Sequence, residues 1–396
     1  MRLSPLLCAG LFFVCAAAAA ADQTATPARR GSFHKTTDNI HLEMVFNNHV
    51  SDPDDESGIV DMVWGSNWAS LPPDVYNSAY IAFSVDDFQN DVTWYEANHQ
   101  DWLEYQCDRV SLAYVPGSDR APLDFANPAV VAYQWANWID AKLSAGYQGI
   151  AVDLLHLTND QARCGHFDSQ HNWVAQYSGQ LHDKHYRRDV LAWERAAHRH
   201  VHAQSPTATM QINATYDPTE SQDDNRKLMT TTDLLFDECG FTRCGDKQNV
   251  TSPDEWLSIE ASLLYVQSQG ICYTTNGEEP EHSSNITQAE RLWVIGNYLL
   301  FKDNCAYMYM TGRQEYGDLV TFPEYAIAIG HSSHAMVEQS GIWERRYSNG
   351  LTLVNPNDAT ATIDLPPGDW VDVDGNPAGP QVTLTKQTAQ VLLKAP

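Results

Sequence analysis

Two acidic residues each close a short apolar run, Asp153 in GYQGIAVDLLHLT and Glu238 in TTDLLFDECGFT. Short apolar runs bounded by turn residues predict buried parallel strands. If these strands belong to one barrel, acids at their carboxyl ends can point into a common pocket. Two carboxylates around one glycosidic bond can cleave it: one protonates the leaving oxygen, and the other is the nucleophile or the base for water. We predict Asp153 in the second role and Glu238 as the general acid.

Asp237 competes with Glu238 for the role of acid, because successive strand residues point to opposite faces and only one can face the pocket. The structural alternative for a strand-end acid such as Asp153 is a helix cap or an ion pair with Arg. Other predicted strand ends carry Asn, Asp, Trp and Tyr, which bind sugar hydroxyls or stack on sugar rings. The predicted substrate-binding residues are Asn47, Trp64, Asp86, His156, Asn213, Asp237, Asn276 and Tyr309.

Metal-dependent and serine-dependent chemistry have less support in the sequence. Glu194, His198 and His202 fall at the i, i+4, i+8 spacing of one helical face, yet Arg195 and Arg199 flank them and predict a solvated outer helix. Neither HExxH nor GxSxG is found, and no GxGxxG or Walker sequence is present. We therefore predict no metal and no cofactor.

The elements that would position these residues alternate between strands and helices. Strands are predicted at 41–47, 59–64, 80–85, 149–153, 209–213, 234–238, 271–275 and 306–310. Helices are predicted at 128–145, 186–204, 253–269 and 287–301. Eight strands with intervening helices favour an α/β fold of the (β/α)₈ TIM-barrel type over an open doubly wound sheet. The long connection after the third strand, 86–127, predicts a substrate-binding excursion that can hold a further strand.

The ends of the chain differ from its middle. Arg2, an apolar run and an alanine tract predict a signal peptide over 1–21, followed by a flexible segment over 22–38. The catalytic barrel is predicted over 39–330. From 333 to 396 only short alternating runs and turn residues occur, which predicts a C-terminal antiparallel β-sandwich. We expect a secreted or periplasmic protein that has no membrane association after signal cleavage.

Cysteine content and charge narrow the functional classes. Six cysteines lie beyond the predicted signal, an even number that favours disulfides over a zinc cluster in an exported protein: Cys107, Cys164, Cys239, Cys244, Cys272 and Cys305. Short spacing favours the pair 239–244, and the position of 272 and 305 on neighbouring predicted strands favours that pair, which leaves 107–164. The formal net charge of −27 disfavours nucleic acid, anionic membranes and polyanionic glycans as partners.

A family resemblance supports this interpretation. The runs APLDFANPAVVAYQWANWIDAKLSAGYQGIAVD and LLFDECGFT resemble the hypothetical glycosyl hydrolase family 15 and the endo-α-1,4-polygalactosaminidase-like barrels. The matching positions are Asp124, Asn127, Pro128, Gly146, Gly149 and Asp153, and later Glu238, Gly240 and Phe241. The α-galactosidase clan is similar in its placement of carboxylates after the fourth and sixth strands. The resemblance implies a barrel glycosidase with Asp153 and Glu238 in its site, whereas the Asp237–Glu238 pair departs from the pattern.

Together these features predict a secreted glycoside hydrolase that cleaves a neutral or amino-sugar polysaccharide or oligosaccharide by a two-carboxylate mechanism. Two other classes stay open. One is a catalytically silent glycan-binding barrel, and the other is a different barrel hydrolase, such as a phosphodiesterase or a metal-dependent deacetylase. The acidic charge and the lack of metal-ligand motifs argue against the last.

Overall fold

Eight parallel strands form a closed barrel in the computed structural model, which describes Phe33, 36–87, 89–238, 240–242, 252–279, 281–303 and 305–395. The strand order is β1-β2-β3-β7-β10-β11-β12-β13. Their bounds are β1 Glu43–Val45, β2 Met62–Trp64, β3 Tyr76–Ala82, β7 Gly149–Asp153, β10 Thr209–Asn213, β11 Leu234–Asp237, β12 Cys272–Glu279 and β13 Ala306–Gly312. The backbone N–H of Met308 donates to the carbonyl oxygen of His41 at 3.0 Å, so β13 closes onto the start of β1. The predicted barrel is confirmed.

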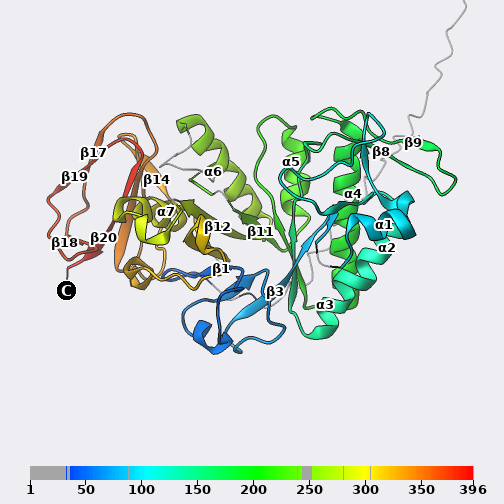
Figure 1. Cartoon of the computed structure of the whole chain (residues 1–396). Helices are drawn as coiled ribbons and strands as arrows, with labels where there is room; N and C mark the ends of the chain where they lie inside the picture. Colours follow the sequence, from blue (N-terminus) through cyan, green and yellow to red (C-terminus); the bar gives the residue numbers. More distant parts are fainter. Residues whose placement is uncertain are drawn as a thin grey trace, which may run out of the picture.

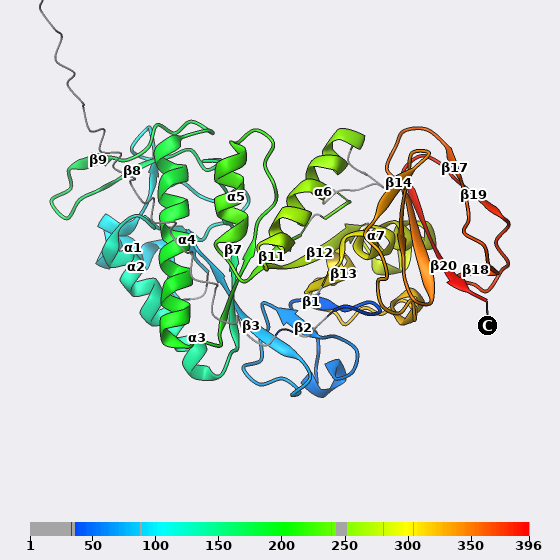
Figure 2. The ribbon, with the colours of Figure 1, turned by 180° about the vertical axis from the view of Figure 1, so that it is seen from behind.

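Helices cover the outside of this barrel (Figures 1 and 2). They are α1 Val92–Asn98, α2 Pro128–Gln134, α3 Asp140–Ala145, α4 Lys184–Gln204, α5 Gln222–Thr230, α6 Pro253–Ser268 and α7 Gln288–Phe301. Side chains cap most of them at the N-terminus, and Thr287 and Glu290 form a reciprocal capping box at α7. The predicted helix over 128–145 is continuous in the structure, with a π-helical turn at Trp135–Ile139 between α2 and α3.

The third barrel strand differs most from its prediction, which was 80–85, whereas β3 spans Tyr76–Ala82. Tyr76 and Tyr80 pack in the barrel interior, and the Ser78 hydroxyl between them donates to Gln211 at 3.0 Å. The inward-facing side chains of β3 are aromatic and polar, so its sequence lacks the apolar run that predicts a buried strand. The residues after Ala82 turn away and form a separate short strand, β4 Val85–Asp86.

Two segments, one between β3 and α2 and the other between β7 and α4, form an excursion at one end of the molecule (Figures 1 and 2). It includes β4, which pairs with β6 Ala121–Pro122, and the sheet of β5 Tyr105–Gln106, β8 Arg163–Phe167 and β9 Trp173–Ala175. A disulfide between Cys107 and Cys164 joins this sheet to the loop after β5. Further strands in the long connection were expected, and the disulfide pair is confirmed.

Antiparallel sheets form the C-terminal region at the other end of the molecule, beside α7 (Figure 1). One sheet has the order β14-β15-β16-β20-β18, and β17 pairs with β19. Their bounds are β14 Val337–Gln339, β15 Ile342–Arg346, β16 Gly350–Asn355, β17 Ala361–Asp364, β18 Trp370–Asp372, β19 Gln381–Leu384 and β20 Thr388–Lys394. Residues of both sheets, such as Leu353 and Val382, share one apolar core. This sandwich packs closely on α7, because a Cβ at Gly296 would lie 2.5 Å from the Cβ of Ala389.

Two further predictions concern cysteines and the N-terminus. The disulfide between Cys272 and Cys305 is confirmed and links the starts of β12 and β13. Cys239 and Cys244 lie outside the described residues, as do the predicted signal peptide and most of the segment over 22–38. In the described part of the chain, no helix combines the length and apolar character needed to span a membrane.

Candidate active site

The two predicted carboxylates lie on either side of Asn213 at the carboxyl ends of three adjacent barrel strands. Asp153 is the last residue of β7, Asn213 the last of β10, and Glu238 directly follows β11. The Nδ2 of Asn213 donates to Asp153 Oδ1 at 3.0 Å and to Glu238 Oε2 at 2.7 Å. These two oxygens are therefore at most about 6 Å apart, and about 5 Å apart if the two amide hydrogens, ~120° apart, each make one bond.

Two tyrosines complete the hydrogen bonding of this carboxylate pair. The Tyr80 hydroxyl donates to Asp153 Oδ2 at 2.9 Å, and the Tyr316 hydroxyl donates to Glu238 Oε1 at 3.0 Å. Asn276 Nδ2 in turn donates to the Tyr316 oxygen at 3.1 Å. Each of the four carboxylate oxygens thus has a donor from a neutral side chain. Such donors fix both carboxyl groups in position and carry no charge themselves.

The electrostatic environment of Glu238 favours its protonated form. Burial raises the pKa of Glu238, and the negative charge of Asp153 raises it further. Hydrogen bonds from Asn213 and Tyr316 and the charge of His156 oppose this rise without cancelling it. A raised pKa is what a carboxyl group needs to act as a general acid.

Asp87 adds a third acid close to this pair. Burial raises the pKa of Asp87, the Arg120 guanidinium lowers it, and the charge of Asp153 raises it further. Arg120 Nε lies 2.6 Å from Asp87 Oδ1. Because Arg120 holds Asp87 in an ion pair, Asp87 is better suited to binding a hydroxyl than to proton transfer.

An aromatic cluster borders the carboxylates. The Phe46 ring contacts Trp64, Tyr80 and Tyr316 at centroid distances of 5.5, 5.4 and 6.2 Å. Trp64 also stacks on Phe236 at 4.8 Å and is only 1% exposed. Trp64 therefore supports the floor of the site from within the barrel. Phe46, Tyr80 and Tyr316, which are half-buried, are the rings of this cluster with surface available to a sugar face.

Backbone strain marks two positions at this end of the barrel. Leu154, directly after Asp153, has φ of 63°, and Phe46, directly after β1, has φ of 58°. Non-glycine residues adopt this left-handed region at a cost of about 1–3 kcal/mol, and such residues cluster at functional sites. At these two left-handed residues the chain turns sharply, directly after β7 and β1.

Several predicted binding residues lie away from the carboxylate pair or below it. Asn47 is fully buried; its amide donates to Glu56 and Ser66, and its oxygen accepts from the Asn67 N–H. Asp86 accepts from the N–H of Gln89 and from the Tyr95 hydroxyl, so it organises the loop after β4. Tyr309 donates to the carbonyl oxygen of Asp318 and accepts from the Val320 N–H. Their predicted contacts with substrate stay predictions.

The other predicted residues lie in or next to the cluster. Asn276 is bonded to Tyr316, and His156 is exposed and close enough to Glu238 to affect its pKa. Asp237 is 5% exposed and accepts from Thr215 and from the N–H of Gly240. Asp237 and Glu238 thus have separate partners, as expected for neighbours on opposite faces of a strand.

Three residues of this site were not predicted from the sequence: Phe46, Tyr80 and Tyr316. Tyr80 could have been found from the alternation of Tyr76, Ser78 and Tyr80 along one strand. Asp87 was predicted with Asp86 as a polar residue after the third strand, and of the two it is Asp87 that lies close to the carboxylate pair. Tyr316 lies in the loop after β13 and has no local signal, since the closure of the barrel alone brings it to Glu238.

Comparisons with known proteins return structural similarity only. No protein-family model matches the chain, and no curated protein matches it. A solved α-amylase from Anoxybacillus is similar with a TM-score of 0.49 and 11% identity, over 91% of this chain and 98% of that one. A family 27 β-L-arabinopyranosidase from Geobacillus stearothermophilus is similar with a TM-score of 0.47 and 9% identity, over 81% of this chain and 75% of that one. A family 31 dextranase from Flavobacterium johnsoniae is similar with a TM-score of 0.45 and 12% identity, over 91% of this chain and 52% of that one.

All three of these proteins are glycoside hydrolases by name. At such TM-scores and identities the similarity carries no argument about activity, and a barrel fold hosts many unrelated reactions.

Proposed function

We propose that this protein is a glycoside hydrolase in which Asp153 is the nucleophile and Glu238 the general acid and base. The observation that carries the proposal is the single Asn213 amide that donates to both carboxylates. It implies a separation of about 5 Å between the two bonded oxygens. Retaining glycosidases place their carboxyl groups about 5–5.5 Å apart, and inverting ones about 6.5–9.5 Å apart. The geometry thus favours retention of anomeric configuration.

The reaction proceeds in two displacements. Glu238 gives its proton to the glycosidic oxygen while an oxygen of Asp153 bonds to the anomeric carbon, so that the leaving alcohol departs and a glycosyl ester forms on Asp153. Glu238, now ionised, takes a proton from water as that water attacks the same carbon. The ester bond breaks, and both carboxyl groups return to their starting states. The raised pKa of Glu238 supports the first proton transfer.

Asn213 and Tyr80 are proposed to hold Asp153 in line for attack. Each hydrogen bond uses one lone pair of an Asp153 carboxylate oxygen, so a second lone pair on that oxygen can attack the anomeric carbon. Tyr316 and Asn213 hold Glu238 in the same way, and Asn276 positions Tyr316. Phe46 and Tyr80 offer ring surface to the sugar beside the carboxylates.

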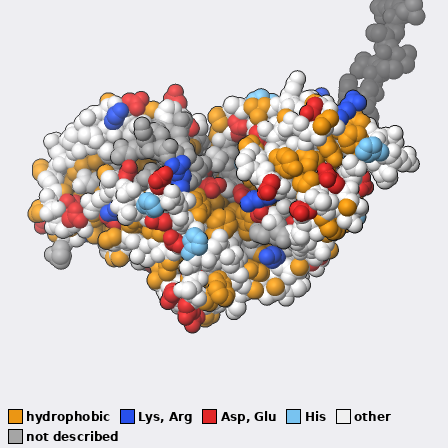
Figure 3. Space-filling model, in the orientation of Figure 1, with side chains coloured by type: hydrophobic (Ala, Val, Ile, Leu, Met, Phe, Trp, Pro, Cys, Tyr) orange, Lys and Arg blue, Asp and Glu red, His pale blue; other side chains and the backbone are white. Residues whose placement is uncertain are grey.

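The substrate class follows from charge. Acidic side chains outnumber basic ones on the face drawn in Figure 3, in keeping with 51 acidic and 24 basic residues in the chain. Such a surface repels polyanionic glycans and admits neutral or cationic ones. We propose a neutral or amino-sugar polysaccharide or oligosaccharide as the substrate, acted on outside the cytoplasm.

The test is a screen of the disulfide-intact protein against neutral, amino-sugar and acidic polysaccharides. Asp153→Asn and Glu238→Gln should each lower the rate of fragment release by about 10³-fold or more, because each removes a reacting group. Asp237→Asn separates the two candidate acids, since its rate should stay within about tenfold of the unaltered protein.

The stereochemistry can be measured on the same substrate. Proton NMR of the first-formed product should show the anomer of the substrate, and a 2-fluoro glycoside should label Asp153 covalently. The inverted anomer as first product would contradict the retaining mechanism. A glycan bound equally by the protein and its Asp153→Asn variant, and cleaved by neither, would support a binding protein instead.

A further inference from the structure

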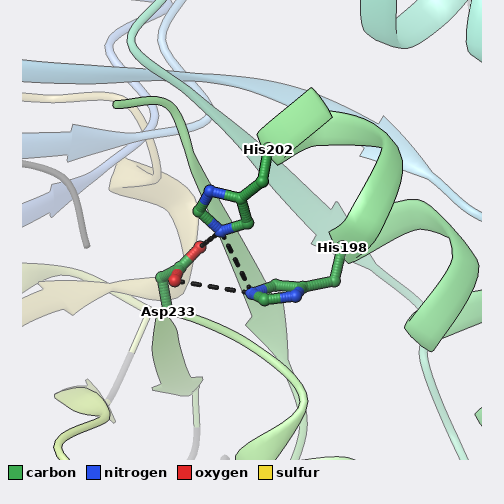
Figure 4. A group of neighbouring side chains, drawn as sticks. All are labelled: His198, His202 and Asp233. Atoms are coloured by element: carbon green, nitrogen blue, oxygen red, sulfur yellow. Dashed lines mark hydrogen bonds and ion pairs between the residues drawn. The ribbon is translucent and has the colours of Figure 1, made fainter. Parts of the chain in front are cut away.

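A second cluster of polar side chains lies at the opposite end of the barrel. His198 and His202 are one turn apart on α4, and Asp233 directly precedes β11 (Figure 4). Glu238 follows the other end of the same strand, about 16 Å away at the usual rise of an extended chain. The cluster is therefore separate from the candidate active site. In TIM barrels this end serves stability and not catalysis.

The three side chains direct their ligand atoms at one point. Nε2 of His198 and Nε2 of His202 are 3.2 Å apart. His198 Nε2 lies 3.4 Å from Asp233 Oδ1, and His202 Nε2 lies 2.9 Å from Asp233 Oδ2. Figure 4 shows both rings turned toward the carboxylate. A tetrahedral Zn²⁺ with bonds of about 2.0–2.1 Å holds its ligand atoms about 3.3–3.4 Å apart, so these spacings suit such an ion.

Hydrogen bonding alone explains the cluster less well. Without a cation, both imidazoles must carry hydrogen on Nε2 to donate to the one carboxylate. The two Nε2 atoms then lie 3.2 Å apart, and neither has a lone pair left to accept a hydrogen bond from the other. A cation between the three groups would instead accept a lone pair from each nitrogen and from the carboxylate. This arrangement would use every ligand atom of the cluster.

The surroundings also fit a metal site. Asp233 is fully buried, whereas the His198 and His202 side chains are 23% and 25% exposed, which leaves room for water as a fourth ligand. The N–H of Met210 donates to Asp233 Oδ2 at 2.9 Å and fixes the carboxylate, as outer partners of metal ligands commonly do. Two imidazoles and one carboxylate suit Zn²⁺ and similar transition ions, whereas Ca²⁺ and Mg²⁺ prefer oxygen ligands.

We propose that His198, His202 and Asp233 bind one Zn²⁺ ion that fastens α4 to the start of β11. From the sequence alone, His198 and His202 predict a solvated helix, because Asp233 is distant in the chain and reaches them only when the barrel forms. The ion would stabilise the folded protein, since it binds three groups that the unfolded chain does not hold together. This role is independent of the proposed hydrolytic reaction.

The experiment uses the full protein without a polyhistidine tag, stripped with EDTA and then titrated with Zn²⁺. Calorimetry should give one Zn²⁺ per chain, and the midpoint of thermal unfolding should rise at saturating Zn²⁺. Co²⁺ in its place should give the visible absorption of a four-coordinate ion. Ca²⁺ at the same concentration should raise the midpoint much less, because its ligand preference differs.

Variants on the same helix separate this site from adventitious binding. His202→Gln should abolish the Zn²⁺-dependent rise and the Co²⁺ spectrum, and His198→Gln serves equally if the first variant folds poorly. His185→Gln is the matched control, because His185 is exposed near the start of α4 and lies outside the cluster. Equal Zn²⁺ uptake and an equal rise in the His202→Gln variant and the unaltered protein would overturn the proposal, as would no uptake by the unaltered protein.

Discussion

The Asp153 charge should control the protonation of Glu238, and replacing Asp153 with Asn tests this directly. Burial and Asp153 together raise the pKa of Glu238. The Asn side chain keeps an oxygen that can accept from Asn213, so the replacement removes the charge and little of the geometry. The pKa of Glu238 should therefore fall in the Asp153→Asn variant.

The size of this fall follows from the separation of the two carboxylates. Two unit charges about 5 Å apart interact by about 3 kcal/mol at an effective dielectric constant of about 20. That energy corresponds to about 2 pKa units. Asp237→Asn provides a matched comparison, because Asp237 is bonded to Thr215 and Gly240 instead of to the pair, and its loss should shift the pKa by less than half as much.

The pKa can be measured without knowing the substrate. Carbon NMR of protein labelled at the glutamate carboxyl carbon follows each titration, and the Glu238→Gln spectrum assigns the signal of Glu238. A pKa of Glu238 that stays the same or rises in the Asp153→Asn variant would refute the coupling. It would also remove the electrostatic reason for assigning Glu238 as the acid.

Three further predictions concern single groups. Tyr316→Phe removes the donor to Glu238 Oε1 and should raise the pKa of Glu238 by about one unit, seen in the same NMR titration; no change would mean that this bond is weak in solution. Burial raises the pKa of Glu43 to about 8, from 4.5 for an ordinary Glu. Between these two pH values the folded protein keeps the proton of Glu43 and the unfolded chain loses it. The free energy of unfolding should therefore fall as pH rises from about 4.5 to 8. Glu43→Gln should accordingly gain up to about 3 kcal/mol at pH ~7 and little at pH ~4 in urea unfolding, and an equal gain at both would contradict this. Replacing Cys272 and Cys305 with Ser opens a disulfide that spans 33 residues and should cost about 3–4 kcal/mol, measured under non-reducing conditions as a lower unfolding midpoint than that of the unaltered protein.

Much of the barrel could be predicted from the sequence because its signals are local. Apolar runs at β7 and β10 gave their bounds correctly, and an acid or amide at the end of each predicted a polar residue at the pocket mouth. Asp153, Asn213 and Glu238 do come together, because parallel neighbouring strands bring their carboxyl ends to one edge. Strand order and strand direction are therefore enough to predict that these three residues meet.

Other features depended on the tertiary structure. Tyr316 reaches Glu238 from 78 residues away in the chain, and Asp233 reaches His202 from 31 residues away. The pattern around each of these residues says nothing about its partner, because the partner is chosen by strand register, barrel closure and helix packing. For the same reason Trp64, a plausible sugar platform by sequence, lies buried in the barrel core. Local periodicity determined which elements form and which strand ends are polar, whereas the closed barrel decided which side chains meet.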